Sequence, residues 1–409
     1  MTDRADTPGT APTVADLERY RQQARAWIAE NLEKLDAPAG IRVVDYYTPD
    51  VMAANRALQR RMFDAGYAGI SWPREYGGQG LDRAYEAVFN AEAAGFATPD
   101  FGVLGGTTSS ACVPTMLAHA DPHFLRTFVP KVLSGEILVC QFFSEPDAGS
   151  DLAGIRTRAT RDGERWILNG QKVWSTFAHL ADWGLCLART DWDVPKHAGL
   201  TWFAVPCDAP GLTIRPIRQV NEAAEFCEDF FDGVRAPLFN VIGGLNNGWR
   251  VAMTTLTNER GGRATVQHLG YEREYWELIE TARKYGKNTA PLVRQQLAWA
   301  YTQVQLMKFS GLRTMARLAA GMPPGPEASV AKLFWSEYHK KLGEIAAGIE
   351  GTDMLIRPTG GTDGDYVTDQ WQNVFLSSRA GTIFSGTSEI QRNITGERVL
   401  GLPKEPRVA

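Results

Sequence analysis

The residues from Gln141 to Thr176 carry the clearest chemical signal in this chain. The stretch opens with an apolar run that leads into the small and polar residues GSD. It closes with WILNGQKVWST, in which Trp174 stands two residues before Thr176. On a strand, side chains two residues apart lie on one face, and a flat ring beside a hydroxyl can hold a planar redox cofactor. A strand tryptophan is also a common core residue, so this stretch alone leaves both interpretations open.

The composition is that of an ordinary globular protein. Hydrophobic residues make up 44% and charged residues 22% of the 409 residues, and the net charge is -4. This length predicts two to three domains. The absence of a long basic run argues against a nucleic-acid partner, and no apolar run reaches the roughly 20 residues that span a bilayer. The polar residues 1–13 predict a disordered leader without an apolar targeting segment.

The metal-binding residue types are too scattered to predict a metal site. The five cysteines lack any CxxC or Cys/His spacing, and the six histidines do not cluster. The cysteines are typical of small buried side chains in a reducing compartment. The expected location is therefore cytoplasmic, and the expected metal content is none.

The periodicity along the chain predicts three blocks. Residues 14–135 have helical spacing after a cap formed by Thr13 and Asp16, residues 136–246 contain short β-type runs, and residues 247–409 are helical again. The turn-rich run at 243–248 marks the second boundary. The expected fold is an α+β multidomain protein: an N-terminal helical domain, a middle antiparallel β-sandwich or barrel, and a C-terminal four-helix bundle. Helices are expected from about residues 50 and 83, and over 122–133, 249–285, 290–320, 326–356 and 386–399.

Four motifs along the chain resemble those of the acyl-CoA dehydrogenase family. They are the loop at 66–80, SEPDAGSD at 144–151, NGQKVWST at 169–176 and GTSEIQR at 386–392. The resemblance covers nearly the whole chain. No GxGxxG follows a predicted strand, so a Rossmann-type dinucleotide site is not supported. This agrees with the family, in which FAD lies between the β domain and the C-terminal helices.

The resemblance implies a set of FAD and substrate contacts. The positions that correspond to FAD contacts in the family are Gln141, Phe143, Ser144, Trp174, Ser175, Thr176, Arg283, Gln295, Thr387 and Glu389. Of these, Arg283 and Gln295 are expected to reach the FAD of a neighbouring subunit. Ser150 matches the position that bonds the pantetheine of CoA. The family's glycine-rich segment is changed at 347–351, which leaves a homodimer or homotetramer and a hetero-oligomer as alternatives.

The base that removes the α-proton is not where many family members carry it. Their C-terminal motif has a glutamate at the position of Ser385, and a serine hydroxyl cannot deprotonate that carbon unaided. A second lineage places the base in a Leu-x-x-Glu-Arg run, which here predicts Glu259 as the base and Arg260 as its orienting or substrate-binding partner. The alternative is that these two residues are a solvated pair on a helix, and Glu389 is a weaker candidate base. Backbone groups of Ser385 and Gly386 are expected to bind the substrate, with the Ser385 N–H on the thioester oxygen.

The expected function is an FAD-dependent acyl-CoA dehydrogenase that forms a 2-enoyl-CoA and passes electrons to an electron-transfer flavoprotein. Two other functions stay open: a half-site or non-catalytic subunit of a hetero-oligomer, and a flavin oxidase or monooxygenase on the same scaffold. The sequence does not predict the acyl group, nor the role of the loop at 358–365.

Overall fold

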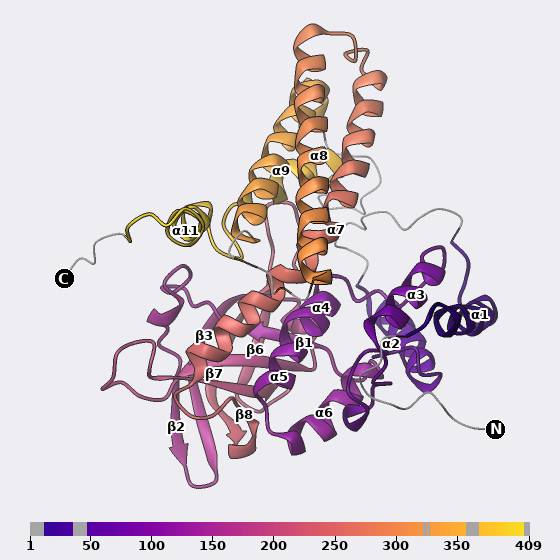
Figure 1. Cartoon of the computed structure of the whole chain (residues 1–409). Helices are drawn as coiled ribbons and strands as arrows, with labels where there is room; N and C mark the ends of the chain where they lie inside the picture. The colour runs from indigo at the N-terminus through magenta and orange to yellow at the C-terminus, as the bar shows by residue number, and fades with distance from the viewer. Residues whose placement is uncertain are drawn as a thin grey trace.

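The chain folds, in the computed structural model, into a helical part, a sheet and a second helical part that follow one another along the sequence (Figure 1). The structure describes residues 12–35, 47–320, 322, 325, 328–356 and 368–404, without the side chains of 260–266 and 318–319. Most of the expected leader at 1–13, and all of the loop at 358–365, lie outside the described residues. The order of the three parts confirms the fold class expected from the sequence.

The N-terminal part is built from helices with well-defined starts. Thr13 caps the first helix as expected, since its side chain and that of Asp16 form a reciprocal capping box. Proline at the first helical position begins two later helices. The helices are α1 (Val14–Asn31), α2 (Pro49–Asp64), α3 (Arg83–Ala93), α4 (Gly102–Gly106), α5 (Val113–His119) and α6 (Pro122–Leu133). A π-helical stretch, Thr107–Cys112, joins α4 to α5.

The middle part is one hydrogen-bonded sheet of eight strands within the described chain. Its path runs β6-β7-β3-β2-β4-β5-β8, and β1 pairs with β4. Most neighbours are antiparallel, but β1 and β2 each run parallel to β4, which the sequence did not predict. The strands are β1 (Val139–Phe142), β2 (Arg158–Asp162), β3 (Arg165–Thr176), β4 (Trp183–Arg189), β5 (Leu200–Pro206), β6 (Leu212–Ile217), β7 (Phe226–Pro237) and β8 (Val241–Ile242).

The C-terminal part is a four-helix bundle that projects away from the sheet in Figure 1. It consists of α7 (Gly248–Lys284), α8 (Pro291–Ala319), α9 (Ala328–Glu350) and α10 (Gln370–Gly381), followed by the short α11 (Ser388–Ile394). The helix α10 was not predicted, although Asp369 and Gln372 form a capping box at its start. A 3-10 turn, Gly351–Leu355, follows α9, and a π-helical stretch, Thr395–Val399, follows α11.

Helix α7 connects the sheet to the bundle. Near its start, Val251 and Ala252 are buried in the core that α5, α6 and the sheet share. Farther along, Tyr271 and Leu278 are buried in the separate core of the bundle. Because one continuous helix belongs to both cores, the middle of α7 is held where the sheet, the N-terminal helices and the bundle meet.

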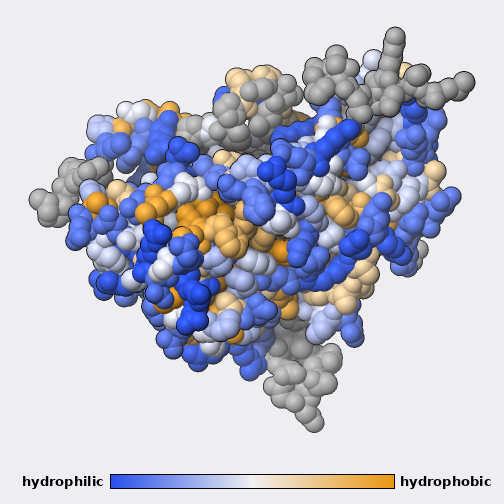
Figure 2. Space-filling model, turned by 90° about the horizontal axis from the view of Figure 1, so that it is seen from below, coloured by the Kyte–Doolittle hydropathy of each residue, from blue (hydrophilic) through white to orange (hydrophobic). Residues whose placement is uncertain are grey.

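None of the described helices is both long enough and apolar enough to cross a bilayer. Seen from below, the molecule presents a largely hydrophilic face with apolar residues gathered in one region (Figure 2).

Candidate functional site

The end of β1 places Gln141 beside a buried thiol. The side-chain nitrogen of Gln141 is buried and donates to no oxygen atom of the described residues. Burial raises the pKa of the Cys112 thiol, a hydrogen bond with the Gln141 side chain lowers it, and the Glu259 carboxylate raises it again. The stretch Thr107–Cys112 contacts both β1, which carries Gln141, and α7, which carries Glu259.

The SEPDAGSD motif is anchored by a buried ion pair. Lys172 has no exposed side-chain surface, and its Nζ lies 2.8 Å from Oε1 of Glu145 and 2.9 Å from the carbonyl oxygen of Phe143. The backbone N–H groups of Arg156 and Thr157 also donate to the Glu145 carboxylate. Burial alone would raise the pKa of Glu145, but Lys172 and these donors lower it. The pair fixes the loop after β1 to β3.

Strand β3 presents Trp174 outward through a bulge. The register between β3 and β7 shifts between Val173 and Ser175, and Trp174 adopts a positive φ of 66°. Its side chain is 57% exposed, while Thr176 is half-buried. Ser175 is buried, and its Oγ donates to Oδ2 of Asp229 at 2.6 Å. The tryptophan and the threonine are thus accessible to a ligand, whereas the hydroxyl of Ser175 is engaged inside the sheet.

The two candidate positions for the base meet in space. The hydroxyl of Ser385 donates a hydrogen bond of 2.8 Å to Oε1 of Glu259, across 126 residues of sequence. Asn258, the residue before Glu259, has its side-chain nitrogen 3.4 Å from Oγ1 of Thr115 on α5. Glu259 is therefore not a carboxylate on a free helix face: it lies at the contact between α7 and the loop that precedes α11.

That loop is held in a strained conformation from two sides. Ser385 and Gly386 have positive φ values of 51° and 88°, which a non-glycine residue adopts at a cost in free energy. The buried side chains of Gln391 and Lys332 donate to the loop carbonyls: Gln391 to Ser385 at 2.9 Å, and Lys332 to Gly386 at 2.7 Å. A Cβ on Gly386 would approach the Gln391 nitrogen to 2.5 Å. The position of Ser385 is thus fixed by its surroundings.

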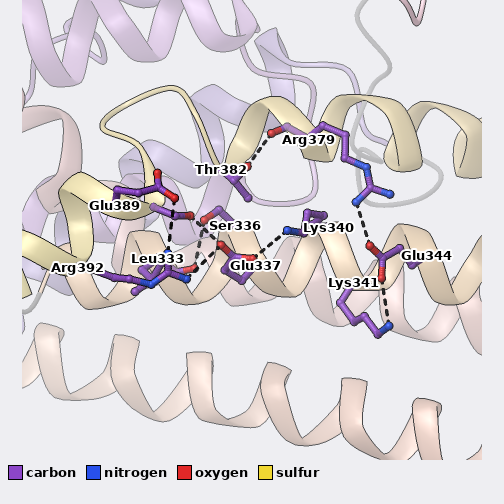
Figure 3. Close-up of polar contacts among 11 residues, drawn as sticks. Leu333, Ser336, Glu337, Lys340, Lys341, Glu344, Arg379, Thr382, Glu389 and Arg392 are labelled. Atoms are coloured by element: carbon purple, nitrogen blue, oxygen red, sulfur yellow. Dashed lines mark hydrogen bonds and ion pairs between the residues drawn. The ribbon is translucent and has the colours of Figure 1, made fainter. Parts of the chain in front are cut away.

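Helix α11 is docked on α9 by charged and hydroxyl side chains (Figure 3). Glu337 on α9 accepts a hydrogen bond from Ser388 at 2.7 Å and pairs with Arg392 and Lys340. Thr387 caps α11. Glu389 is exposed in its first turn, where backbone and Thr387 hydrogen bonds lower the pKa of its carboxyl. The structure thus brings Thr387 and Glu389 into the same segment as Ser385 and Gly386.

The loop after β1 carries Ser150 on its surface. Ser150 is exposed, and the next residue, Asp151, pairs with Lys196 at 2.7 Å. Arg189 donates to the carbonyl oxygens of Ala153 and Ile155 and fixes the far side of this loop. Ser150 therefore lies on an ordered surface loop and is accessible to a ligand from solvent.

Two predicted cofactor residues lie far from the rest of the site. Arg283 is exposed at the end of α7, where it pairs with Glu280, and Gln295 is exposed near the start of α8. Figure 1 places the connection from α7 to α8 at the end of the bundle remote from the sheet. Trp174 belongs to β3 in the sheet, so the two residues and Trp174 lie on elements at opposite ends of the picture. The side chain of Arg260 lies outside the described residues.

The side chains of Gln141, Trp174 and Thr176 suit a planar cofactor. A buried amide donor at Gln141, an exposed ring at Trp174 and a half-buried hydroxyl at Thr176 are groups that can bind a heteroaromatic ring with acceptor atoms. In the described part of the chain, His, Cys, Asp and Glu side chains form no group of three that could hold a metal ion.

Several residues that shape the site were not predicted. Glu145 and Lys172 belong to two neighbouring motifs, at 144–151 and 169–176. Their opposite charges could have predicted an ion pair between these motifs. Asp229 and Lys332 had no such signal, because their roles depend on contacts between distant segments.

The chain matches known proteins along nearly its full length. Three family models match in order: "Acyl-CoA dehydrogenase, N-terminal domain" at residues 15–136, "middle domain" at 140–234 and "C-terminal domain" at 246–400. It is 41% identical to the acyl-CoA dehydrogenase IpdE1 of Mycobacterium tuberculosis, over 96% of this chain and 99% of that protein.

Two solved structures share the fold. One is the Tcur3481-Tcur3483 "steroid ACAD", with a TM-score of 0.73 and 26% identity over 96% of this chain and 99% of that chain. The other is the ChsE4-ChsE5 complex from Mycobacterium tuberculosis, with a TM-score of 0.70 and 26% identity over 97% and 100%.

Proposed function

The chain belongs to the acyl-CoA dehydrogenase family, and we propose that it oxidises an acyl-CoA thioester to the 2-enoyl-CoA with Glu259 as the base. One observation carries this assignment: Ser385, at the position where many relatives carry the base, donates a hydrogen bond of 2.8 Å to Glu259. A carboxylate that replaces the missing one must reach the same α-carbon, and this contact puts it within one hydrogen bond of that position.

FAD is the cofactor that the family implies. When bound, it supplies the ring that accepts the β-hydride. We propose that Gln141 donates to this ring through its buried amide, that Trp174 covers one face and that Thr176 bonds its edge. Phe143 and Ser144 would line the ring from the end of β1, and Thr387 and Glu389 would contact the adenosine half.

Each residue near Glu259 has a separate task in this mechanism. Glu259 takes the α-proton and holds it at a carboxylate oxygen, while the Ser385 hydroxyl fixes the direction of that carboxylate. The backbone N–H of Ser385 donates to the thioester oxygen and stabilises the charge that develops there as the proton leaves. Arg260 orients Glu259 or the substrate, and Ser150 bonds the pantetheine arm.

The acyl group is proposed to be bulky or ring-bearing. A solved relative is described as a steroid enzyme, and an exposed aromatic side chain, Phe384, stands next to Ser385 with its ring centroid 6.2 Å from that of Trp335. An exposed aromatic ring beside the proposed base suits a wide apolar group better than a short chain. Electrons would then pass to an electron-transfer flavoprotein.

The experiment is anaerobic bleaching of the flavin by a panel of straight, branched and polycyclic acyl-CoAs. Bleaching by a polycyclic acyl-CoA in the wild type, and its loss in Glu259→Gln with FAD still bound, support the proposal. Normal bleaching in Glu259→Gln would remove Glu259 from the role of base. Peroxide produced at the rate of turnover in air would indicate an oxidase instead.

A hetero-oligomeric half-site is the second candidate. Two solved relatives are named as pairs of proteins, and Arg283 and Gln295 flank the α7–α8 connection, at the end of the bundle remote from the sheet that carries Trp174. A second copy or a related chain would therefore bring these residues to the cofactor. Flavin that is retained only after co-expression with a related chain favours the hetero-oligomer, while flavin retained by the chain purified alone favours a homo-oligomer.

A further inference from the structure

A bulge in β3 decides which of its side chains face the core. Lys172 pairs with Asp229, but Ser175 pairs with Cys227, so Trp174 has no partner on β7. Side chains alternate between faces along a strand. Without the extra residue, Trp174 would share the face of the buried Lys172, and Ser175 would point to the opposite face. The bulge therefore exchanges the two: Trp174 is exposed and Ser175 is buried.

The bulged conformation, with Trp174 exposed and Ser175 buried, needs an interaction that stabilises it. Trp174 has a φ of 66°, in the left-handed region that a bulky side chain adopts only when its surroundings impose it. The neighbouring Ser175 is 2% exposed and donates to Oδ2 of Asp229 at 2.6 Å. Asp229 has no exposed surface, and its other oxygen, Oδ1, has no hydrogen-bond partner among the described residues. A buried carboxylate with a single side-chain donor binds that donor strongly.

We infer that Asp229 is a positioning residue: through Ser175 it holds the bulge that presents Trp174 to the cofactor. The statement about the cofactor rests on the proposed function, whereas the link from Asp229 to Trp174 stands without it. Removal of the acceptor at 229 leaves the Ser175 hydroxyl buried and unpaired, which favours its return to the exposed face and the collapse of Trp174 toward the sheet.

Burial makes Asp229 a side chain that titrates near neutral pH. Burial raises the pKa of Asp229 to about 7. Its charged and titratable neighbours are Lys172, Glu228, Cys140, Cys186 and Cys227. Burial raises the pKa of the Cys186 thiol to about 12 and that of Cys227 to about 11. His179, beside Cys227, has a pKa lowered by burial.

The test is ¹⁹F NMR of the full chain labelled with 5-fluorotryptophan. The resonance of Trp174 is assigned by its loss in Trp174→Phe, and the other eleven of the twelve tryptophans report on the rest of the fold. Asp229→Val removes the acceptor, Ser175→Ala removes the donor, and Asp229→Asn keeps an acceptor of the same shape. Asp232→Asn, an exposed carboxyl on the same strand, is the matched control.

The expected result is a change confined to one resonance. Asp229→Val and Ser175→Ala shift or broaden the Trp174 signal and weaken FAD binding about tenfold, the effect of losing one buried hydrogen bond. Asp229→Asn and Asp232→Asn leave the signal in place. A Trp174 signal unchanged in both Asp229→Val and Ser175→Ala overturns the inference. If no FAD binds even to the wild type, the proposed function fails, but the NMR result still decides the role of Asp229.

Discussion

Ser385 donates a hydrogen bond to Glu259, with 2.8 Å between the serine Oγ and the carboxylate Oε1. The contact joins a strained loop before α11 to the middle of α7. The side chains at the two positions are therefore neighbours. On the proposed function, this explains how the base can stand at position 259 when residue 385 is a serine.

The first prediction is that the two positions can exchange roles. Glu259→Gln should slow flavin bleaching by about 10³-fold, within the range for loss of a general base. Ser385→Ala should slow it about tenfold, because Glu259 remains but loses one donor. The double variant Glu259→Gln/Ser385→Glu should recover part of the lost rate. Stopped-flow absorbance of the flavin measures all three.

The control for this exchange is Glu272→Gln, which neutralises another carboxylate on α7. It should bleach at the wild-type rate. If the double variant bleaches no faster than Glu259→Gln alone, with FAD bound to both, a carboxylate at position 385 cannot replace the one at position 259.

The second prediction concerns the buried pair of Glu145 and Lys172. Glu145→Gln leaves the Lys172 ammonium buried without its counter-charge, so the free energy of unfolding should fall by about 3–5 kcal/mol. The exposed pair of Asp151 and Lys196 has the same kind of contact at 2.7 Å. Asp151→Asn should therefore cost at most about 1 kcal/mol. Urea denaturation of both variants measures the contrast, and equal losses would contradict the importance of burial.

The sequence predicted some parts of this arrangement and not others. Helical and strand spacing was sufficient for the order of the three blocks, because periods near 3.6 and 2 are distinct over many residues. The capping pair of Asp369 and Gln372 was available as a signal for α10 and was missed. The contact between Ser385 and Glu259 could not follow from spacing, since it depends on how the loop before α11 packs against α7.

Strand β3 shows where prediction from side-chain alternation fails. Simple alternation correctly groups Trp174 with Thr176, but it also groups both with Lys172, which the structure buries completely. The bulge at Trp174 reverses the pattern after Lys172. A single inserted residue leaves little trace in the local sequence, because it is stabilised by Asp229 on the neighbouring strand and not by its own segment.

The third prediction is that the free energy of unfolding decreases as the pH rises, because Asp229 is buried. Burial raises the pKa of its carboxyl to about 7 in the folded state. The folded chain thus keeps a proton that the unfolded chain releases at lower pH. The free energy of unfolding should therefore decrease as the pH rises from about 4 to 7, by an amount on the order of 4 kcal/mol. Asp229→Asn should remove this decrease, as measured by urea denaturation across the pH range.

The exposed Asp232 serves as the control here as well. Asp232→Asn should keep the wild-type slope of stability against pH. Parallel slopes for Asp229→Asn and the wild type would show that Asp229 stays ionised throughout and would contradict the prediction.

The fourth prediction follows from the position of Arg283 at the end of the bundle remote from the sheet, which carries Trp174. If Arg283 reaches the cofactor of a second copy, each site takes Glu259 from one chain and Arg283 from the other. Glu259→Gln alone should be inactive, and Arg283→Ala alone should bind FAD weakly. In a mixed oligomer, the Arg283→Ala chain supplies an intact Glu259 and its neighbour supplies an intact Arg283, so one kind of site is complete. Co-expression of the two variants with different affinity tags, followed by tandem purification, should therefore recover bleaching activity that neither variant has alone. Activity no greater than the sum of the separate variants would place Arg283 outside the neighbouring site, and a chain that elutes as a monomer would do the same.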